Sequence, residues 1–111
     1  MVVRYDDMQL SQIFRALADA TRRDILRRTL VGAVSVSGLA VDYAMSFAAV
    51  QKHVAVLEEA GLVIKETAGR ERLVRAVPTQ IARARACLDQ LELIWRHRLN
   101  ALDAVLAESK E

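Results

Sequence analysis

Cysteine, proline, glycine and aromatic residues are all scarce in this sequence of 111 residues. It has one cysteine, one proline and four glycines, and aromatic residues make up 5% of it. A lone cysteine excludes an internal disulfide and is typical of a reducing compartment, so we expect a cytoplasmic protein. Because proline and glycine are too few to form a flexible linker, the sequence predicts one domain over residues 1–111.

Several classes of function have no support in the residues. No apolar run is long enough to cross a membrane, and acids follow the short apolar start too closely for a signal peptide. A glycine-rich phosphate loop, a nucleophile elbow and a cluster of His, Cys and acidic residues are absent, so we expect neither an enzyme nor a cofactor. His53 and His97 fall in separate predicted helices without zinc-ligand spacing, so we expect no metal site.

The composition is apolar and only weakly basic. Hydrophobic residues make up 53% and the formal net charge is +2. This balance favours closely packed helices and leaves apolar surface for a partner chain. So small a net charge is weak evidence for nucleic-acid binding, so that prediction has to rest on where the charges lie along the chain.

Residues 34–63 contain two amphipathic helical patterns separated by the short break Ala44–Met45. Ser46 is a good N-cap for the second helix, and Gly61 suits the left-handed position after its end. So short a break predicts a helix-turn-helix whose second helix can enter a major groove. The apolar faces consist of Val36, Leu39, Ala40 and Tyr43 in the first helix and Val50, Val54 and Leu57 in the second.

The opposite face of the second helix is small or polar toward its amino end. Glu58 and Glu59 at the carboxyl end would repel phosphates, so the amino end is expected to face nucleic acid. The alternative is an ordinary solvated face. The candidate contacts are Ser46, Ala48, Gln51 and Lys52, with His53 at the flank.

Two further helices are predicted before this motif. The first covers residues 8–18 and includes Leu10 and Phe14 on its apolar face. Asp19 caps the second, which runs from Ala20 to about Leu30 with Ile25, Leu26 and Leu30 inward. Its outer face carries Arg22, Arg23, Arg27 and Arg28, interpreted as either a solvated face or a basic patch.

A β-hairpin is predicted directly after the helix-turn-helix. Residues 62–66 and 71–77 are rich in β-branched and apolar side chains, and 67–70 contain a glycine turn. A basic hairpin at this place is the pattern of a wing, which grips the DNA backbone or minor groove. Arg70 and Arg72 near the tip are the candidate contacts, whereas Lys65 and Arg75 equally fit a solubilising role.

The last predicted helix covers residues 79–107 and is the longest. Its apolar positions form a near-heptad seam, wider than one small domain needs. We interpret part of this seam, together with the helix over 8–18, as a homodimer surface; the alternative is a cap on the monomer core. Cys87 on this helix is either a structural cysteine or a redox sensor. The dimer candidates are Leu10, Phe14, Leu91, Trp95, Leu99, Leu102 and Leu106.

Four segments resemble the ArsR-type winged helix-turn-helix regulators: residues 14–26, residues 45–63, Gly69–Arg70, and residues 93–102. The resemblance implies a homodimeric bacterial transcription regulator, usually a repressor, that releases its operator on an inducing signal. It maps the DNA contacts to Ser46, Phe47, Ala48, Gln51, Lys52, His53, Arg70 and Arg72.

The chain departs from the family pattern at three places. Ala20 replaces a usual proline, and Leu73 and Val74 replace an aromatic pair. Residues 37–41 lack the cysteine pair of metal-sensing members, so the chain resembles the branch that senses no metal, and its inducer is unknown.

The expected fold class is mainly α with a small β-hairpin. It comprises a winged helix-turn-helix of about five helices, a two-stranded wing and a long C-terminal dimerisation helix. The expected function is sequence-specific binding of double-stranded DNA at a palindromic operator by a homodimer. The alternative is a winged-helix module that binds protein and no operator.

Overall fold

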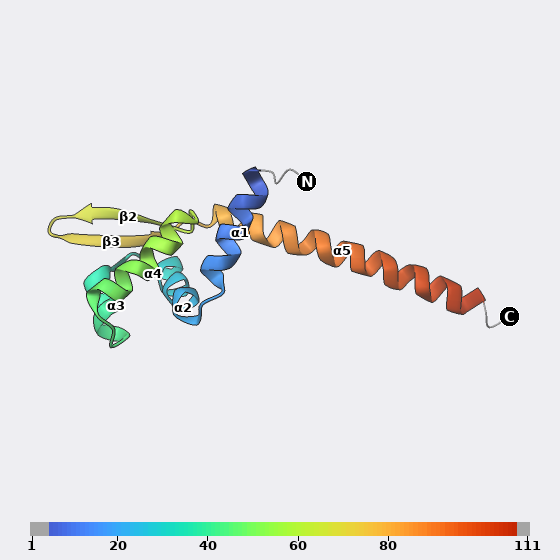
Figure 1. Ribbon diagram of the computed structural model, residues 1–111, viewed down its shortest axis with the longest axis horizontal. Helices are drawn as coiled ribbons and strands as arrows, with labels where there is room; N and C mark the ends of the chain where they lie inside the picture. The colour runs from blue at the N-terminus through green and yellow to red at the C-terminus, as the bar shows by residue number, and fades with distance from the viewer. Residues whose placement is uncertain (1–4, 109–111) are drawn as a thin grey trace.

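A computed structural model describes residues 5–108, which form five helices and a three-stranded antiparallel sheet. The first four helices and the sheet form a head, from which the last helix leads away (Figure 1), and the principal extents are 74 × 32 × 20 Å. The predicted mainly α winged-helix fold is thus confirmed. In chain order the elements are α1 (Tyr5–Leu17), α2 (Ala20–Val31), β1 (Val34–Ser35), α3 (Val36–Asp42), α4 (Phe47–Glu59), β2 (Val63–Ala68), β3 (Glu71–Ala76) and α5 (Thr79–Glu108).

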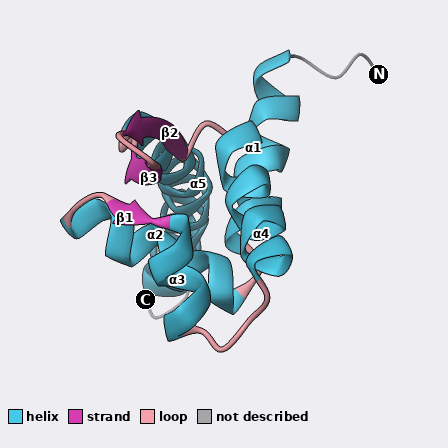
Figure 2. Ribbon diagram, turned by 90° about the vertical axis from the view of Figure 1, so that its left-hand side faces the viewer, coloured by secondary structure: helices cyan, strands magenta, loops and turns pink. Residues whose placement is uncertain are grey.

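One hydrophobic core holds the head together, and every helix and the hairpin contribute to it. Seen from the end of the head, the strands lie on one side and α1 and α4 on the other (Figure 2). The predicted inward residues of α4, Val50, Val54 and Leu57, are all buried. Burial of one such side chain is worth about 1.5–3 kcal/mol, so this core fixes the orientation of α4.

The predicted helix caps are confirmed. The side chains of Asp19 and Ser46 accept hydrogen bonds from the backbone N–H groups of Arg22 and Ala49, at 3.0 and 3.1 Å. Gly61 has φ +74°, the left-handed region, and the N–H of Leu62 donates to the Leu57 carbonyl at 3.0 Å. This bond closes a Schellman motif, which ends α4 and turns the chain into β2.

Three details of the prediction need correction. Helix α1 begins at Tyr5 rather than residue 8. Leu30, predicted inward, is 49% exposed, because it lies outside the face of α2 that packs on the core. Thr29 is buried instead, and its hydroxyl donates a hydrogen bond to the Leu26 carbonyl. The sheet has a third strand, since β1 pairs with β3 through Val34↔Val74 and Ser35↔Leu73.

The hairpin turn is tight. Ala68 pairs with Glu71 across a two-residue turn, and Gly69 at its first position has φ +63°, which suits a type II′ turn. Because β1 leads directly into α3, the β1–β3 pairing also fixes the wing relative to the helix-turn-helix. Along residues 5–108, no helix combines the length and apolar composition that a membrane span requires.

Candidate nucleic-acid interface

The turn between α3 and α4 is held by side chains from α2. Tyr43, the C-terminal cap of α3, donates its hydroxyl hydrogen bond to Asp24, and burial raises the pKa of this hydroxyl. Arg28 donates to the Asp42 carboxylate at 2.6 Å. Ala44 then adopts φ +52°, a left-handed conformation that is costly for alanine. These contacts set the direction in which α4 leaves the turn.

Helix α4 presents the predicted row to solvent. The row begins with the small side chain of Ala48, is polar in its middle at Gln51 and Lys52, and is small again at Ala55. Such a helix face can approach base edges closely and offer both donors and acceptors to them. The exposed members of the predicted set are Ser46, Phe47, Ala48, Gln51 and Lys52.

His53 differs from the rest of the set because it is half-buried against the start of α2. Its Nδ1 lies 3.4 Å from the Arg22 guanidinium and 3.9 Å from an Asp19 carboxylate oxygen. A guanidinium can only donate, so a hydrogen bond between these two groups requires Nδ1 to be the acceptor. His53 therefore connects α4 to α2, at the side of the exposed row.

The arginines at the start of α2 cap α1, which the sequence interpretation missed. Arg22 donates to the carbonyls of Ala16 and Arg15 at 2.8 and 2.9 Å, and Arg23 to that of Leu17 at 2.8 Å. These carbonyls lie in the last turn of α1, where the helix offers no N–H group four residues on; that of Arg15 also accepts from the N–H of Ala18 at 3.2 Å. A signal was available, because two arginines follow the end of a predicted helix within a few residues. This part of the basic face is structural.

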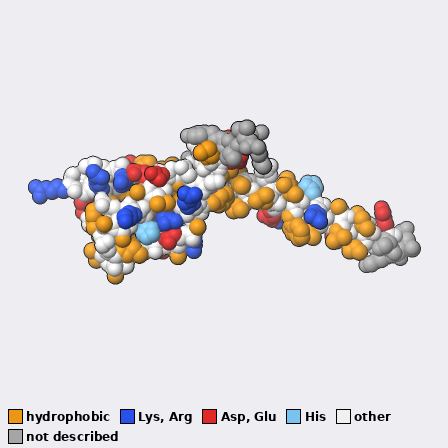
Figure 3. Space-filling model, in the orientation of Figure 1, with side chains coloured by type: hydrophobic (Ala, Val, Ile, Leu, Met, Phe, Trp, Pro, Cys, Tyr) orange, Lys and Arg blue, Asp and Glu red, His pale blue; other side chains and the backbone are white. Residues whose placement is uncertain are grey.

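The wing carries two kinds of cation. Lys65 pairs with Glu58 at 3.4 Å and Arg75 with Glu66 at 3.2 Å. Within residues 5–108, by contrast, Arg70 and Arg72 have no acidic partner, and neither has Lys52 on α4. Within the described residues, the lysine and the two arginines that the sequence assigned to DNA thus lack acidic partners, in contrast to Lys65 and Arg75. Figure 3 shows lysine and arginine side chains on the head and at the end of the wing.

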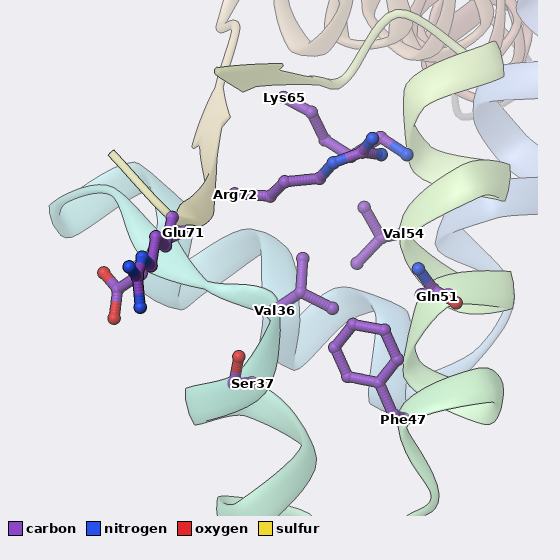
Figure 4. A pocket seen from close by; sticks show the side chains of 9 residues that line it. Val36, Ser37, Phe47, Gln51, Val54, Lys65, Glu71 and Arg72 are labelled. Carbon is purple, nitrogen blue, oxygen red and sulfur yellow. The ribbon is translucent and has the colours of Figure 1, made fainter. Parts of the chain in front are cut away.

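A cleft of about 310 Å³ lies between α3, α4 and the wing. Figure 4 shows Lys65 and Arg72 extending from the wing toward α4, over an apolar floor. Gln51 lines the α4 side. The floor is formed by Val36 and Val54, and Phe47 forms an apolar wall.

The predicted dimer residues fall in two environments. Leu10 and Phe14 of α1 are half-buried against the core. On α5, every residue from Leu88 to Glu108 is exposed, and hydrophobic side chains cover much of this length in Figure 3. The exposed dimer candidates are Leu91, Trp95, Leu99, Leu102 and Leu106.

Cys87 is half-buried in a hollow between α1 and α5. Arg83 crosses this hollow and donates to Gln9 of α1 at 2.8 Å. The residues that the structure describes contain no group of three or more His, Cys, Asp or Glu side chains placed to hold a metal ion.

Comparison with known proteins gives consistent results, although no family model matches the chain. The HTH-type transcriptional regulator Rv2034 of Mycobacterium tuberculosis (strain ATCC 25618 / H37Rv) is 42% identical over 77 residues, which are 69% of this chain and 72% of that protein. An ArsR-like transcriptional regulator from Rhodococcus sp. RHA1 is 34% identical with a TM-score of 0.82, and the match covers 94% of both chains. A further ArsR family regulator is 33% identical with a TM-score of 0.77, and the match covers 86% of this chain and 97% of the other.

Proposed function

Because this chain belongs to the ArsR family of winged helix-turn-helix transcriptional regulators, we propose that it is a bacterial, cytoplasmic repressor that binds a palindromic operator as a homodimer. Membership in this family of regulators also agrees with the expectation that the protein is not an enzyme.

The observation that carries the proposal is which cations form ion pairs with acidic side chains and which do not. In the described part of the chain, Lys52, Arg70 and Arg72 have no acidic partner, while Lys65 and Arg75 of the same wing do. A cation without a protein partner neutralises a phosphate without first giving up an ion pair. The unpaired set joins the start of α4 to the wing, so one duplex can contact both.

The proposed binding mode places the amino end of α4 in the major groove. Gln51 has a donor and an acceptor and is exposed in the middle of the row, so it reads an adenine edge. Ser46, Phe47 and Ala48 contact the groove at the start of the helix, and Lys52 contacts the backbone. Arg70 and Arg72 grip phosphates or the minor groove beside it. His53 contributes from the flank, where Arg22 orients its ring.

The homodimer is supported by α5. A stretch of exposed apolar side chains extends from Leu88 to Leu106 on a helix that leaves the head. Exposed apolar patches of such length mark interaction surfaces. A second copy of α5, together with α1, would cover this surface and give two α4 helices for two half-sites about one turn of DNA apart.

Fluorescence anisotropy with DNA from upstream of the protein's own coding sequence tests the proposal. We expect saturable binding at two proteins per site, weakening steeply as the salt concentration rises. Transcription in vitro from the same promoter should decrease when the protein is added; an increase would make it an activator. A stable dimer without salt-dependent DNA affinity would instead favour a protein-binding module.

A further inference from the structure

From the cleft between α4 and the wing, we infer that the protein binds a small organic acid with an apolar body, and that this acid competes with DNA. The competition rests on the proposed function, whereas acid binding to the free protein does not.

The charge of the cleft fits an anion. Lys65 and Arg72 extend into it from neighbouring strands, as Figure 4 shows, and Arg72 is the cation assigned to the ligand, because Lys65 pairs with Glu58 of α4 at 3.4 Å. Arg72 has no acidic partner among residues 5–108, and a guanidinium can hold a carboxylate through two parallel hydrogen bonds. Glu71 also lines the cleft, but its carboxylate lies away from these two head groups in Figure 4.

The floor of the cleft fits an apolar body. Val36 and Val54 are 4% and 1% exposed and close its inner end. Phe47, at the start of α4, is 49% exposed and forms a wall of the cleft, so its ring offers a surface for stacking. A carboxylate at Arg72 would place the rest of the ligand over these side chains.

The size of the cleft limits the ligand. A volume of about 310 Å³ is at the lower end of the range for small-molecule sites. It accommodates an acid built on one ring and is too small for nucleotides with several phosphates. The ligand class is therefore a monocyclic or short branched carboxylic acid.

The position of the cleft gives the acid a regulatory effect. Its walls include Gln51 and Arg72, which are two of the proposed DNA contacts. An acid bound to Arg72 removes the cation that a phosphate needs and fills the space beside α4. The acid and the DNA then exclude one another, and the acid acts as an inducer.

Benzoate, with benzamide and acetate as matched probes, tests the binding. Nuclear magnetic resonance of the full, DNA-free, ¹⁵N-labelled protein should show saturable shifts confined to α3, α4 and the wing at benzoate concentrations on the order of millimolar, as expected for so small a ligand. Benzamide lacks the charge and acetate lacks the ring, so both should bind about tenfold more weakly or worse. Equal binding of benzamide, or no shifts in the cleft with benzoate, would overturn the inference.

Two variants locate the site. Arg72→Gln should weaken benzoate binding about tenfold or more, since it removes the charge-assisted hydrogen bonds. Arg75→Gln, on the same strand but paired with Glu66, should leave it unchanged. Equal loss in both variants would reduce the effect to general surface charge and would contradict the site.

The competition is measured with operator DNA, adding sodium benzoate or sodium chloride at equal ionic strength because salt alone weakens DNA binding. Benzoate should raise the apparent dissociation constant more than chloride does, in proportion to its concentration. If benzoate binds but DNA affinity follows chloride, the inducer role is wrong. If benzoate binds and no DNA does at any salt concentration, the proposed function itself fails.

Discussion

Arg22 and His53 join α2 and α4, the two helices on which the proposed DNA-facing surface depends. The guanidinium of Arg22 lies 3.4 Å from His53 Nδ1 and also donates to the Ala16 and Arg15 carbonyls. One side chain from the start of α2 therefore caps α1 and contacts α4.

Arg22→Gln should lower the free energy of unfolding by about 1–2 kcal/mol, because carbonyls at the end of α1 lose a charged donor. Urea denaturation measures this loss. The matched control is Arg27→Gln on the same helix, whose ion pair with Asp24 is exposed and should be worth less than about 1 kcal/mol. Equal losses would show that Arg22 has no special role.

Asp19 should make the free energy of unfolding depend on pH in the acidic range. The backbone N–H of Arg22 holds the pKa of this carboxyl below its usual value of 3.8. A carboxyl with a lowered folded-state pKa contributes stability above the unfolded-state pKa, and this contribution disappears as the pH falls through the folded-state pKa. The unfolding free energy of the wild type should therefore decrease more, from about pH 5 downward, than that of Asp19→Asn, which keeps the cap without the charge. Parallel pH curves would contradict this role.

Dimerisation should be lost when charge enters the exposed face of α5. Leu99→Glu combined with Leu102→Glu should give monomers in sedimentation at micromolar concentration, because the carboxylates would be buried between two chains. Asn100→Glu combined with Ala104→Glu adds the same charge on the opposite side of the helix and should leave the dimer intact. A wild-type protein that is already monomeric at this concentration would remove the proposed interface.

Gln51 should affect the sequence specificity of DNA binding, whereas Arg70 should affect the affinity for any DNA and its salt dependence. Gln51→Ala should weaken binding to the operator by about 1–3 kcal/mol per half-site while leaving scrambled DNA nearly unaffected, since it removes base reading. Arg70→Ala should weaken both and lower the salt slope by about one unit for each phosphate that is no longer neutralised. Arg75 already forms an ion pair with Glu66, so Arg75→Ala should change neither the affinity for DNA nor the salt slope. A competition titration would exclude Gln51 from recognition if its operator-to-scrambled ratio stayed at the wild-type value.

DNA binding should need no metal. Residues 37–41 lack thiolate ligands, and thiolates are typical of tight zinc sites. Operator affinity should be the same before and after treatment with a chelator, and elemental analysis should find no stoichiometric zinc. Tight zinc binding that changes the affinity would contradict the assignment to the branch without metal sensing.

The sequence alone was sufficient for the features that depend on neighbours in the chain. Apolar spacing placed α3, α4 and their buried faces, and Asp19, Ser46 and Gly61 marked helix ends because capping acts within about one turn. The hairpin followed from β-branched residues around Gly69. The exposed row on α4 followed from helix period, since a buried Val50–Val54–Leu57 face leaves the opposite face to solvent.

Only the tertiary structure decided which charged side chains are available. Arg22 and His53 are 31 residues apart, and Arg28 meets Asp42 across α2 and α3, so no local pattern separates these arginines from a solvated face. Sequence patterns likewise do not show that Lys65 forms an ion pair with Glu58, or that Arg72 has no acidic partner within the described residues. The strand β1 and the cleft beside Phe47 likewise depend on segments distant in sequence. Local chemistry determines elements and their caps, whereas the partner of a charge depends on how those elements pack.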